Sequence, residues 1–224
     1  MKKIKKVFSL MLVLIMVFGS MSVPSTSVEA AVTAKSLVSS ALKYMESFDT
    51  ISYSYSWDYT SNDVVRSRTG MVISDSEIEH GFYMDDSQIE KAWEEYQKKN
   101  KIYRKGASSS EWTIYTDTTY DSNSKSLKKG TQYLLGHLKN MKITSTGEKS
   151  YTITASPDYS DTDIKKITLT IDKKKKCVTK IKKTYKDHEG TYYNSSNKYP
   201  IKNEVVTWSN ICYGKGGLKI PSGL

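Results

Sequence analysis

Acidic and imidazole side chains gather in one short stretch that contains Asp75, Glu77, Glu79 and His80. The stretch is predicted to be the tip of a strand hairpin, and alternation along a strand directs neighbouring side chains to opposite faces. The four groups are therefore not expected to converge on a substrate. The other two histidines stand apart at positions 137 and 188, and no histidine has a second ligand at the spacing typical of a metal site.

Nucleophile and phosphate-binding motifs are also missing from the sequence. No serine lies in a nucleophile-elbow context, and no glycine-rich loop follows a strand and opens a helix. The stretch 121–125 begins like a calcium-binding loop but lacks the required glycine and closing glutamate. Cys177 lies beside a run of lysines and could be a thiol of lowered pKa, although a structural disulfide is the favoured role. We expect no enzymatic activity, no cofactor and no metal.

The most regular feature is the stretch 51–60, ISYSYSWDYT, which alternates without a break. Its odd positions carry Ile, Tyr or Trp and its even positions carry Ser, Asp or Thr, which predicts a strand with one wet face. The aromatic face could belong to an ordinary packed core or could line a cavity for an apolar guest. Tyrosine and tryptophan have polar ends that need a partner, and methionine and aromatic walls suit an irregular apolar ligand. A curved sheet covered by helices, however, also needs large side chains to fill space.

The candidate ligand-binding residues are large and adaptable side chains that we expect on the inward faces of the predicted elements. They are Tyr53, Tyr55, Trp57, Tyr59, Met71, Phe82, Met84, Trp93, Trp112 and Trp208.

Three amphipathic helices are predicted, over 34–48, 87–99 and 127–141. The second begins with a capping box at 87–90 and carries Trp93 on its apolar stripe, so it could be either a docked helix or a lid over a ligand. Gly130 and Gly136 weaken the third. The predicted strands are 51–60, 64–74, 78–84, 101–105, 111–116, 142–146, 149–155, 164–172, 177–186 and 201–213.

The last three strands can be aligned with one another. A hairpin loop at 174–176 would place Leu169 opposite Ile181, and a disulfide between Cys177 and Cys212 would place Ile181 opposite Trp208. The three residues would then form one apolar row, which a slip of one residue would turn outward. The agreement of the two constraints favours both the sheet and the disulfide, although two free thiols remain the alternative.

This order of elements resembles the LolA/LppX-type lipoprotein-carrier superfamily. The resemblance covers about residues 35–221 and includes ITLTID at 167–172, VTKI at 178–181 and VTWSNICYG at 206–214, followed by LKIP at 218–221. It implies an α+β fold in which a curled antiparallel half-barrel sheet of about ten strands carries about three helices across its concave face. It also implies an apolar cavity between sheet and helices that binds acyl chains or lipidated molecules. Many relatives carry a lipidation cysteine that this chain lacks.

The first thirty residues have the pattern of a secretory signal, with lysines before an apolar run at 7–18 and small residues before a cut after Ala30. The run is shorter than a bilayer requires, although an uncleaved anchor is the alternative. We expect residues 31–224 to form one domain that is secreted or extracytoplasmic and not lipid-anchored. Residues 1–30 carry four lysines and one glutamate, so their removal lowers the net charge from +10 to +7. That surplus favours anionic surroundings, but nucleic acid is not expected because no binding motif is present.

The sequence leaves two functional hypotheses. In the first, the chain is a monomeric, non-enzymatic binding protein for a lipid or other amphiphile. In the second, it is a cell-envelope binding or sensor module with a filled core, which engages an anionic wall polymer, membrane headgroups or a partner protein through its basic surface. The lysine run at Lys173, Lys174, Lys175 and Lys176 is the candidate anionic-surface site, and a solvated turn is the plain alternative.

Overall fold

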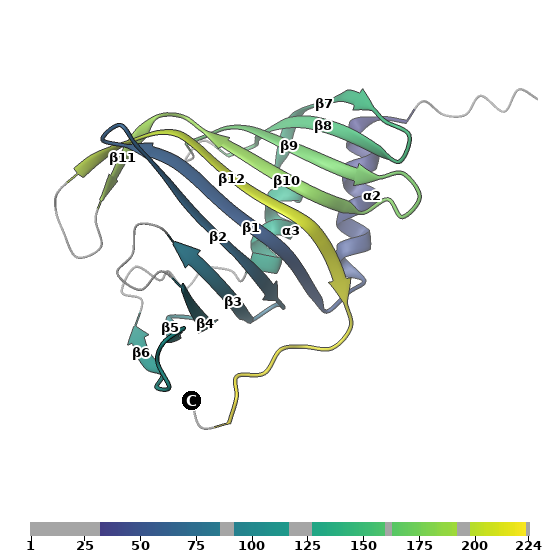
Figure 1. The fold of residues 1–224 in the computed structure, drawn as a ribbon. Coiled ribbons are helices and arrows are strands. Elements are labelled where there is room, and N and C mark those ends of the chain that lie inside the picture. Colours follow the sequence, from purple (N-terminus) through teal and green to yellow (C-terminus); the bar gives the residue numbers. More distant parts are fainter. Residues whose placement is uncertain (1–31, 86–91, 117–126, 160–162, 192–197, 223–224) are drawn as a thin grey trace, which may run out of the picture. The chain divides into compact units, whose positions relative to one another are not determined.

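Twelve strands form one antiparallel sheet in the computed structural model, which describes residues 32–85, 92–116, 127–159, 163–191 and 198–222 (Figure 1). Apart from Val32, these residues belong to a unit that spans Thr33–Leu224. The strands follow the order β6-β5-β4-β3-β2-β1-β12-β10-β9-β8-β7, and β11 pairs with β12. The sheet is curved and is not closed, because β6 and β7 lie at its two ends.

The strand bounds follow the predicted pattern closely in most of the chain. They are β1 (Thr50–Ser61), β2 (Val64–Ser74), β3 (Ile78–Asp85), β4 (Ala92–Lys98), β5 (Lys101–Gly106), β6 (Thr113–Thr116), β7 (Leu138–Thr146), β8 (Ser150–Pro157), β9 (Ile164–Asp172), β10 (Val178–Tyr185), β11 (His188–Thr191) and β12 (Lys198–Gly214).

Two helices, α2 (Ala34–Glu46) and α3 (Leu127–Gly136), lie on one face of the sheet, which we call the inner face (Figure 1). Thr33 caps α2, because its hydroxyl oxygen accepts a hydrogen bond from the Ser36 N–H while the Ser36 hydroxyl oxygen accepts one from the Thr33 N–H. The apolar stripe of α2 is buried, and it includes Leu37, Ala41 and Met45. The predicted count of about ten strands and three helices is thus close to the twelve strands and two helices of the described residues.

The core lies between these helices and the inner face of β1, β2, β8, β9, β10 and β12. Every second residue of these strands points into the core. In β9, for example, Ile167, Leu169 and Ile171 are all fully buried. The predicted register is confirmed, with Ile181 opposite both Leu169 and Trp208. The apolar row across three strands therefore exists, and it faces the helices.

The predicted disulfide is wrong, because Cys177 and Cys212 are both free thiols. Pairing between β10 and β12 does not extend as far as the two cysteines, but ends at Ile181 and Trp208. Beyond that point Asn210 has a φ of 54°, and Cys212 pairs instead with Ser52 of β1. Cys177 is buried whereas Cys212 is exposed, so the two side chains lie in different surroundings.

The predicted helix over 87–99 is also wrong in its described part, because Ala92–Lys98 is strand β4. It pairs with β3 on one side and β5 on the other, which satisfies its backbone more fully than a short surface helix would. Trp93 therefore lies in the sheet and not on a lid. The capping box at 87–90 and the calcium-like stretch at 121–125 lie outside the described residues, as does the predicted signal segment.

The predicted third helix is shorter than expected. It ends at Gly136, and Leu138 already begins β7. Gly136 is the last residue of the helix, where glycine is common, whereas Gly130 lies inside the helix near its start. No helix among the described residues is long and apolar enough to span a bilayer.

Candidate functional site, a groove on the outer face of the sheet

A groove of about 810 Å³ crosses the sheet from β12 to β5. Paired residues of antiparallel strands have their side chains on the same face of the sheet. The strand register therefore places most of the groove's lining on the face opposite the helices, which we call the outer face. Two rows across the strands supply these side chains. The first row is Ser209, Ser54, Met71, Phe82, Glu94 and Lys105, and the second includes Ser56, Thr69, Met84 and Ala92.

The middle of this outer groove is apolar and open to solvent. Met71 is 69% exposed, Phe82 54% and Met84 63%. Soluble proteins seldom leave three large hydrophobic side chains together in this state unless the surface binds something. Gly70 also belongs to the lining, and a Cβ at this position would lie 2.5 Å from the carbonyl oxygen of Phe82. A glycine therefore permits close packing of β2 against β3 below the groove.

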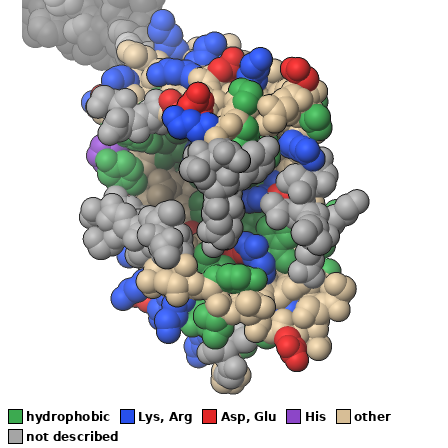
Figure 2. All heavy atoms as spheres, turned by 90° about the vertical axis from the view of Figure 1, so that its left-hand side faces the viewer, with side chains coloured by type: hydrophobic (Ala, Val, Ile, Leu, Met, Phe, Trp, Pro, Cys, Tyr) green, Lys and Arg blue, Asp and Glu red, His purple; other side chains and the backbone are tan. Residues whose placement is uncertain are grey.

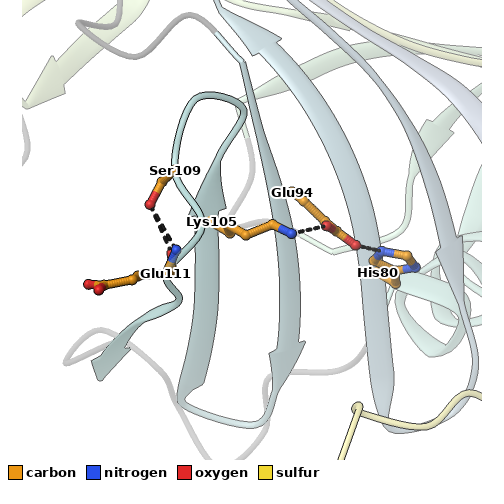
Figure 3. Close-up of polar contacts among 5 residues, drawn as sticks. All are labelled: His80, Glu94, Lys105, Ser109 and Glu111. Atoms are coloured by element: carbon orange, nitrogen blue, oxygen red, sulfur yellow. Dashed lines mark hydrogen bonds and ion pairs between the residues drawn. The ribbon is translucent and has the colours of Figure 1, made fainter. Parts of the chain in front are cut away.

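One end of the groove carries charge (Figure 3). His80 of β3, Glu94 of β4 and Lys105 of β5 lie in a line, with His80 Nε2 2.9 Å from Glu94 Oε1 and Lys105 Nζ 3.6 Å from Glu94 Oε2. The His80 ring also stacks on Tyr96, with 4.0 Å between the ring centroids. The opposite end carries the hydroxyls of Ser54, Ser56 and Ser209.

The loop between β5 and β6 forms a wall at the charged end. Ser109 belongs to the lining, and its hydroxyl oxygen accepts a hydrogen bond from the Glu111 N–H at 3.1 Å (Figure 3). Trp112 follows, and its ring lies 5.0 Å from Lys105 Nζ and 5.6 Å from the Tyr96 ring. The loop is thus held against β4 and β5 by side chains of the outer face.

The inner face opposite the groove carries a network of aromatic and charged groups. The Arg68 guanidinium lies between the rings of Trp57 and Trp93, at 5.0 and 5.4 Å, and pairs with Asp85 at 2.7 Å. Trp57 donates a hydrogen bond from Nε1 to Glu204 Oε1 at 2.7 Å. Arg68 and Asp85 thus neutralise each other, whereas Trp93 Nε1 and Glu204 Oε2 are buried without a hydrogen-bond partner among the described residues.

The ten predicted ligand-binding residues do not share one cavity. Met71, Phe82, Met84 and Trp112 lie on the outer face, whereas Tyr53, Tyr55, Trp57, Trp93 and Trp208 belong to the inner face, as does Tyr59, which stacks on Trp57. The expectation that all ten point inward is therefore wrong. The groove lining also includes Tyr55 and Trp93. They belong to the inner-face row of residues that lies between the two outer-face rows.

Several groove residues were not predicted, among them Ser54, Ser209, Glu94 and Lys105. The signal for Ser54 was present in the alternation of β1, because the wet face of that strand is one end of the groove. The aromatic face of the same strand looks into the core at Tyr53, which is only 3% exposed. Glu94 carried no such signal, because its segment was predicted as a helix and is strand β4. Lys105 lies in a segment that was correctly predicted as a strand, but its alternation did not single out a binding face.

The contacts of the groove residues suit the binding of a ligand. The Ser109 hydroxyl is engaged with the Glu111 main chain and not with His80, so no base activates it. In the part of the chain that the structure describes, no cluster of three His, Cys, Asp or Glu side chains is arranged to hold a metal ion. An apolar stripe between hydroxyls and an ion pair suits a molecule with an apolar body and a polar end.

The predicted anionic-surface site is a tight turn between β9 and β10. Asp172 closes it, because its Oδ1 accepts hydrogen bonds from the Lys174 N–H at 2.8 Å and the Lys175 N–H at 2.6 Å. These two lysines are exposed, whereas the ammonium groups of Lys173 and Lys176 lie 5.0 and 5.6 Å from the Tyr151 ring.

The chain matches no family model and no curated protein. Among solved structures it is similar to the lipoprotein LppX of Mycobacterium tuberculosis, with 7% identity, a TM-score of 0.48, and 84% of this chain and 98% of that chain covered. It is also similar to LprF of Mycobacterium bovis (11%, 0.40, 84% and 96%) and to a LolA superfamily protein of Nitrosomonas europaea (11%, 0.31, 85% and 96%). These structures include members of the superfamily that the sequence resembles, at low identity and low TM-score.

Proposed function

We propose that this chain is a binding protein for a lipid or other amphiphile, and that the outer groove is its binding site. The observation that carries the proposal is the stripe of Met71, Phe82 and Met84, each more than half exposed within a groove of about 810 Å³. Ligand pockets usually enclose roughly 300–1,000 Å³ and combine an apolar lining with a few polar groups.

The arrangement of the groove matches the two parts of an amphiphile. An alkyl chain would lie across Met71, Phe82 and Met84, whose flexible thioethers and flat ring adapt to an irregular apolar surface. The polar end would meet Glu94, Lys105 and the Ser109 loop. Because Glu94 and Lys105 bring one negative and one positive charge, this end favours a neutral or zwitterionic headgroup.

The proposal includes export of the chain, without enzymatic activity. It is supported by the lysines and the apolar run of residues 1–30, which have the pattern of a cleaved signal.

A calorimetric titration tests the groove directly. The purified protein is titrated with dodecyl maltoside below its micellar concentration, and the same titration is run on Phe82→Ser combined with Met84→Ser. Both side chains are exposed, so the substitutions remove apolar contact area without disturbing the core. We expect the double variant to bind at least tenfold more weakly, which corresponds to about 1.4 kcal/mol.

The matched control replaces two exposed apolar residues that do not line the groove. Val65→Ser combined with Ile114→Ser removes side chains that are 72% and 58% exposed. This control should bind like the unaltered protein. Equal losses in both double variants, or no binding by the unaltered protein, would refute the groove as an amphiphile site.

A further inference from the structure

Aromatic rings gather around a carboxylate at the charged end of the outer groove. Phe82 pairs with Glu94 and His80 pairs with Tyr96, so the four side chains lie together on the outer face of β3 and β4. The centroid of the His80 ring is 4.0 Å from that of Tyr96 and 5.0 Å from that of Phe82. The Trp112 ring continues the series, 5.6 Å from that of Tyr96. Four rings therefore form a connected series beside one carboxylate.

This combination is suited to a positively charged group. Aromatic faces attract cations, and sites lined by several rings are typical of those that bind quaternary ammonium groups. The protein already holds a cation here, because Lys105 Nζ lies 5.0 Å from the Trp112 ring centroid and 3.6 Å from Glu94 Oε2 (Figure 3). Ring and carboxylate together thus accept a positive charge at this end of the groove.

The pair between Lys105 and Glu94 is open to a ligand. Its separation of 3.6 Å is longer than the 2.7 Å between Arg104 and Glu95 on the inner face. The Lys105 side chain is 32% exposed and that of Glu94 20%, and both residues line the groove. A loose pair that solvent reaches contributes little to stability, so a ligand that enters between the two charges displaces little.

The charges of the pair define the ligand that can enter. A cation that took Glu94 would leave Lys105 without its counter-ion, and an anion that took Lys105 would remove a cation from Glu94. A zwitterion offers each side chain an opposite charge. On the side of the domain shown in Figure 2, Lys and Arg side chains are spread among Asp, Glu and hydrophobic side chains, so the choice of headgroup depends on local pairs such as this one.

We propose that the charged end of the outer groove binds a phosphocholine group. This assignment rests on the proposed function, because it names the headgroup that the same groove would take. The trimethylammonium group lies against the rings of His80, Tyr96 and Trp112, where its methyl groups contact the ring faces. The Glu94 carboxylate neutralises it, and the phosphate pairs with the Lys105 ammonium group. An alkyl chain on the phosphate would continue along the apolar middle of the groove.

The headgroup is tested first without an alkyl chain, so that the result does not depend on the apolar stripe. The purified protein is titrated by calorimetry with phosphocholine, phosphoethanolamine and choline. Phosphocholine should bind at least tenfold more tightly than choline, because choline leaves Lys105 without a counter-ion. It should bind at least threefold more tightly than phosphoethanolamine, whose ammonium group has no methyl groups to contact the rings.

Two substitutions should separate the halves of the headgroup. Glu94→Gln keeps the shape of the side chain and removes its charge, so it should lower the affinity for phosphocholine at least tenfold and raise that for inorganic phosphate, because Lys105 is freed. Lys105→Met should also lower the affinity for phosphocholine at least tenfold, but it should raise that for choline, because Glu94 is freed. Glu77→Gln is the matched control, since it opens a carboxylate–lysine pair of the same 3.6 Å separation, with Lys98. It should change each affinity less than twofold.

Three results would overturn the proposal. One is the absence of phosphocholine binding by the unaltered protein. Another is an effect of Glu94→Gln and Lys105→Met no larger than that of Glu77→Gln, which would indicate general attraction to a charged protein. The third is equal affinity for phosphocholine and choline, which would show that Lys105 does not meet the phosphate.

Dodecylphosphocholine, used below its micellar concentration, separates this proposal from the proposed function. Binding at least tenfold tighter than that of phosphocholine would identify a lipid as the source of the headgroup. Binding of phosphocholine with no gain from the dodecyl chain would refute the amphiphile groove and support a headgroup that no lipid carries. Binding of dodecyl maltoside without binding of phosphocholine would refute the headgroup site alone.

Discussion

Alternation along β3 separates two ionisable neighbours and gives them different surroundings. The sequence predicted that the acidic hairpin at 75–80 would be divided between faces, and the structure confirms it. His80 reaches Glu94 in the outer groove, whereas Glu79 lies on the inner face and accepts a hydrogen bond from the Leu127 N–H at the start of α3. What the sequence could not reveal is the partner of each group, because Glu94 and Leu127 reach the hairpin only through the tertiary fold.

Glu79 should make the stability of the protein depend on pH. Burial raises its pKa from 4.5 to about 7, and the Glu95 carboxylate adds to the rise. The stability that protonated Glu79 contributes is therefore fully present below pH 4.5 and is lost as the pH rises to about 7. Glu79→Gln keeps an acceptor for the Leu127 N–H and removes the charge, so it should raise the free energy of unfolding at pH 8 by up to about 3 kcal/mol.

Urea unfolding at pH 8 and pH 4.5 checks this expectation. The gain from Glu79→Gln should shrink towards zero at the lower pH. Glu77→Gln is the control, because its side chain is 64% exposed on the same hairpin and should change stability little at either pH. A loss of stability in Glu79→Gln at pH 8 would show that the charged carboxylate is needed at the start of α3.

Elements whose apolar residues recur with one clear period were predicted correctly. Elements whose apolar residues fit both a helical and a strand period were not. Strands 64–74 and 164–172 have the predicted bounds, and the three-strand register is confirmed through Ile181. The segment of β4 was mistaken for a helix because Trp93 and Tyr96 fit a helical stripe, although they lie on opposite faces of the strand. Over seven residues the two periods fit equally well, and only the ladders to β3 and β5 decide between them.

The turn between β9 and β10 is the element that we propose for contact with anionic surfaces. Lys174 and Lys175 project from it without an ion pair among the described residues. Lys174→Ser with Lys175→Ser should weaken binding to phosphatidylglycerol vesicles roughly tenfold or more, since each lysine near an anionic surface contributes about 1 kcal/mol. Vesicle co-sedimentation over a range of salt measures this.

Lys165→Ser with Lys166→Ser removes the same charge from exposed positions on β9 and is the matched control. It should reduce binding less than the turn variant does. Binding that does not fall with salt, or equal losses in both variants, would exclude a specific electrostatic role for the turn.

For the whole domain, the unexpected result is that both faces of the sheet carry large apolar side chains. On β2 and β3, Met71, Phe82 and Met84 occupy one face while Val72 and Tyr83 occupy the other. Period-two alternation identifies two faces but does not say which of them the helices cover. Which face the helices cover depends on the pairing of β2 with β1. The sequence therefore named Met71, Phe82 and Met84 as candidate ligand-binding residues but placed them on the inner face, whereas they lie on the outer face.

The most direct test of the account locates a bound amphiphile on the domain. A neutral alkyl alcohol that carries a photoreactive diazirine is incubated with the protein, irradiated, and mapped by mass spectrometry of the resulting peptides. The account predicts labels on Met71, Phe82 and Met84 of the outer groove, and their loss in Phe82→Ser with Met84→Ser. Labels concentrated on Tyr53 and Tyr55 of the inner face, or spread without preference over the surface, would contradict it.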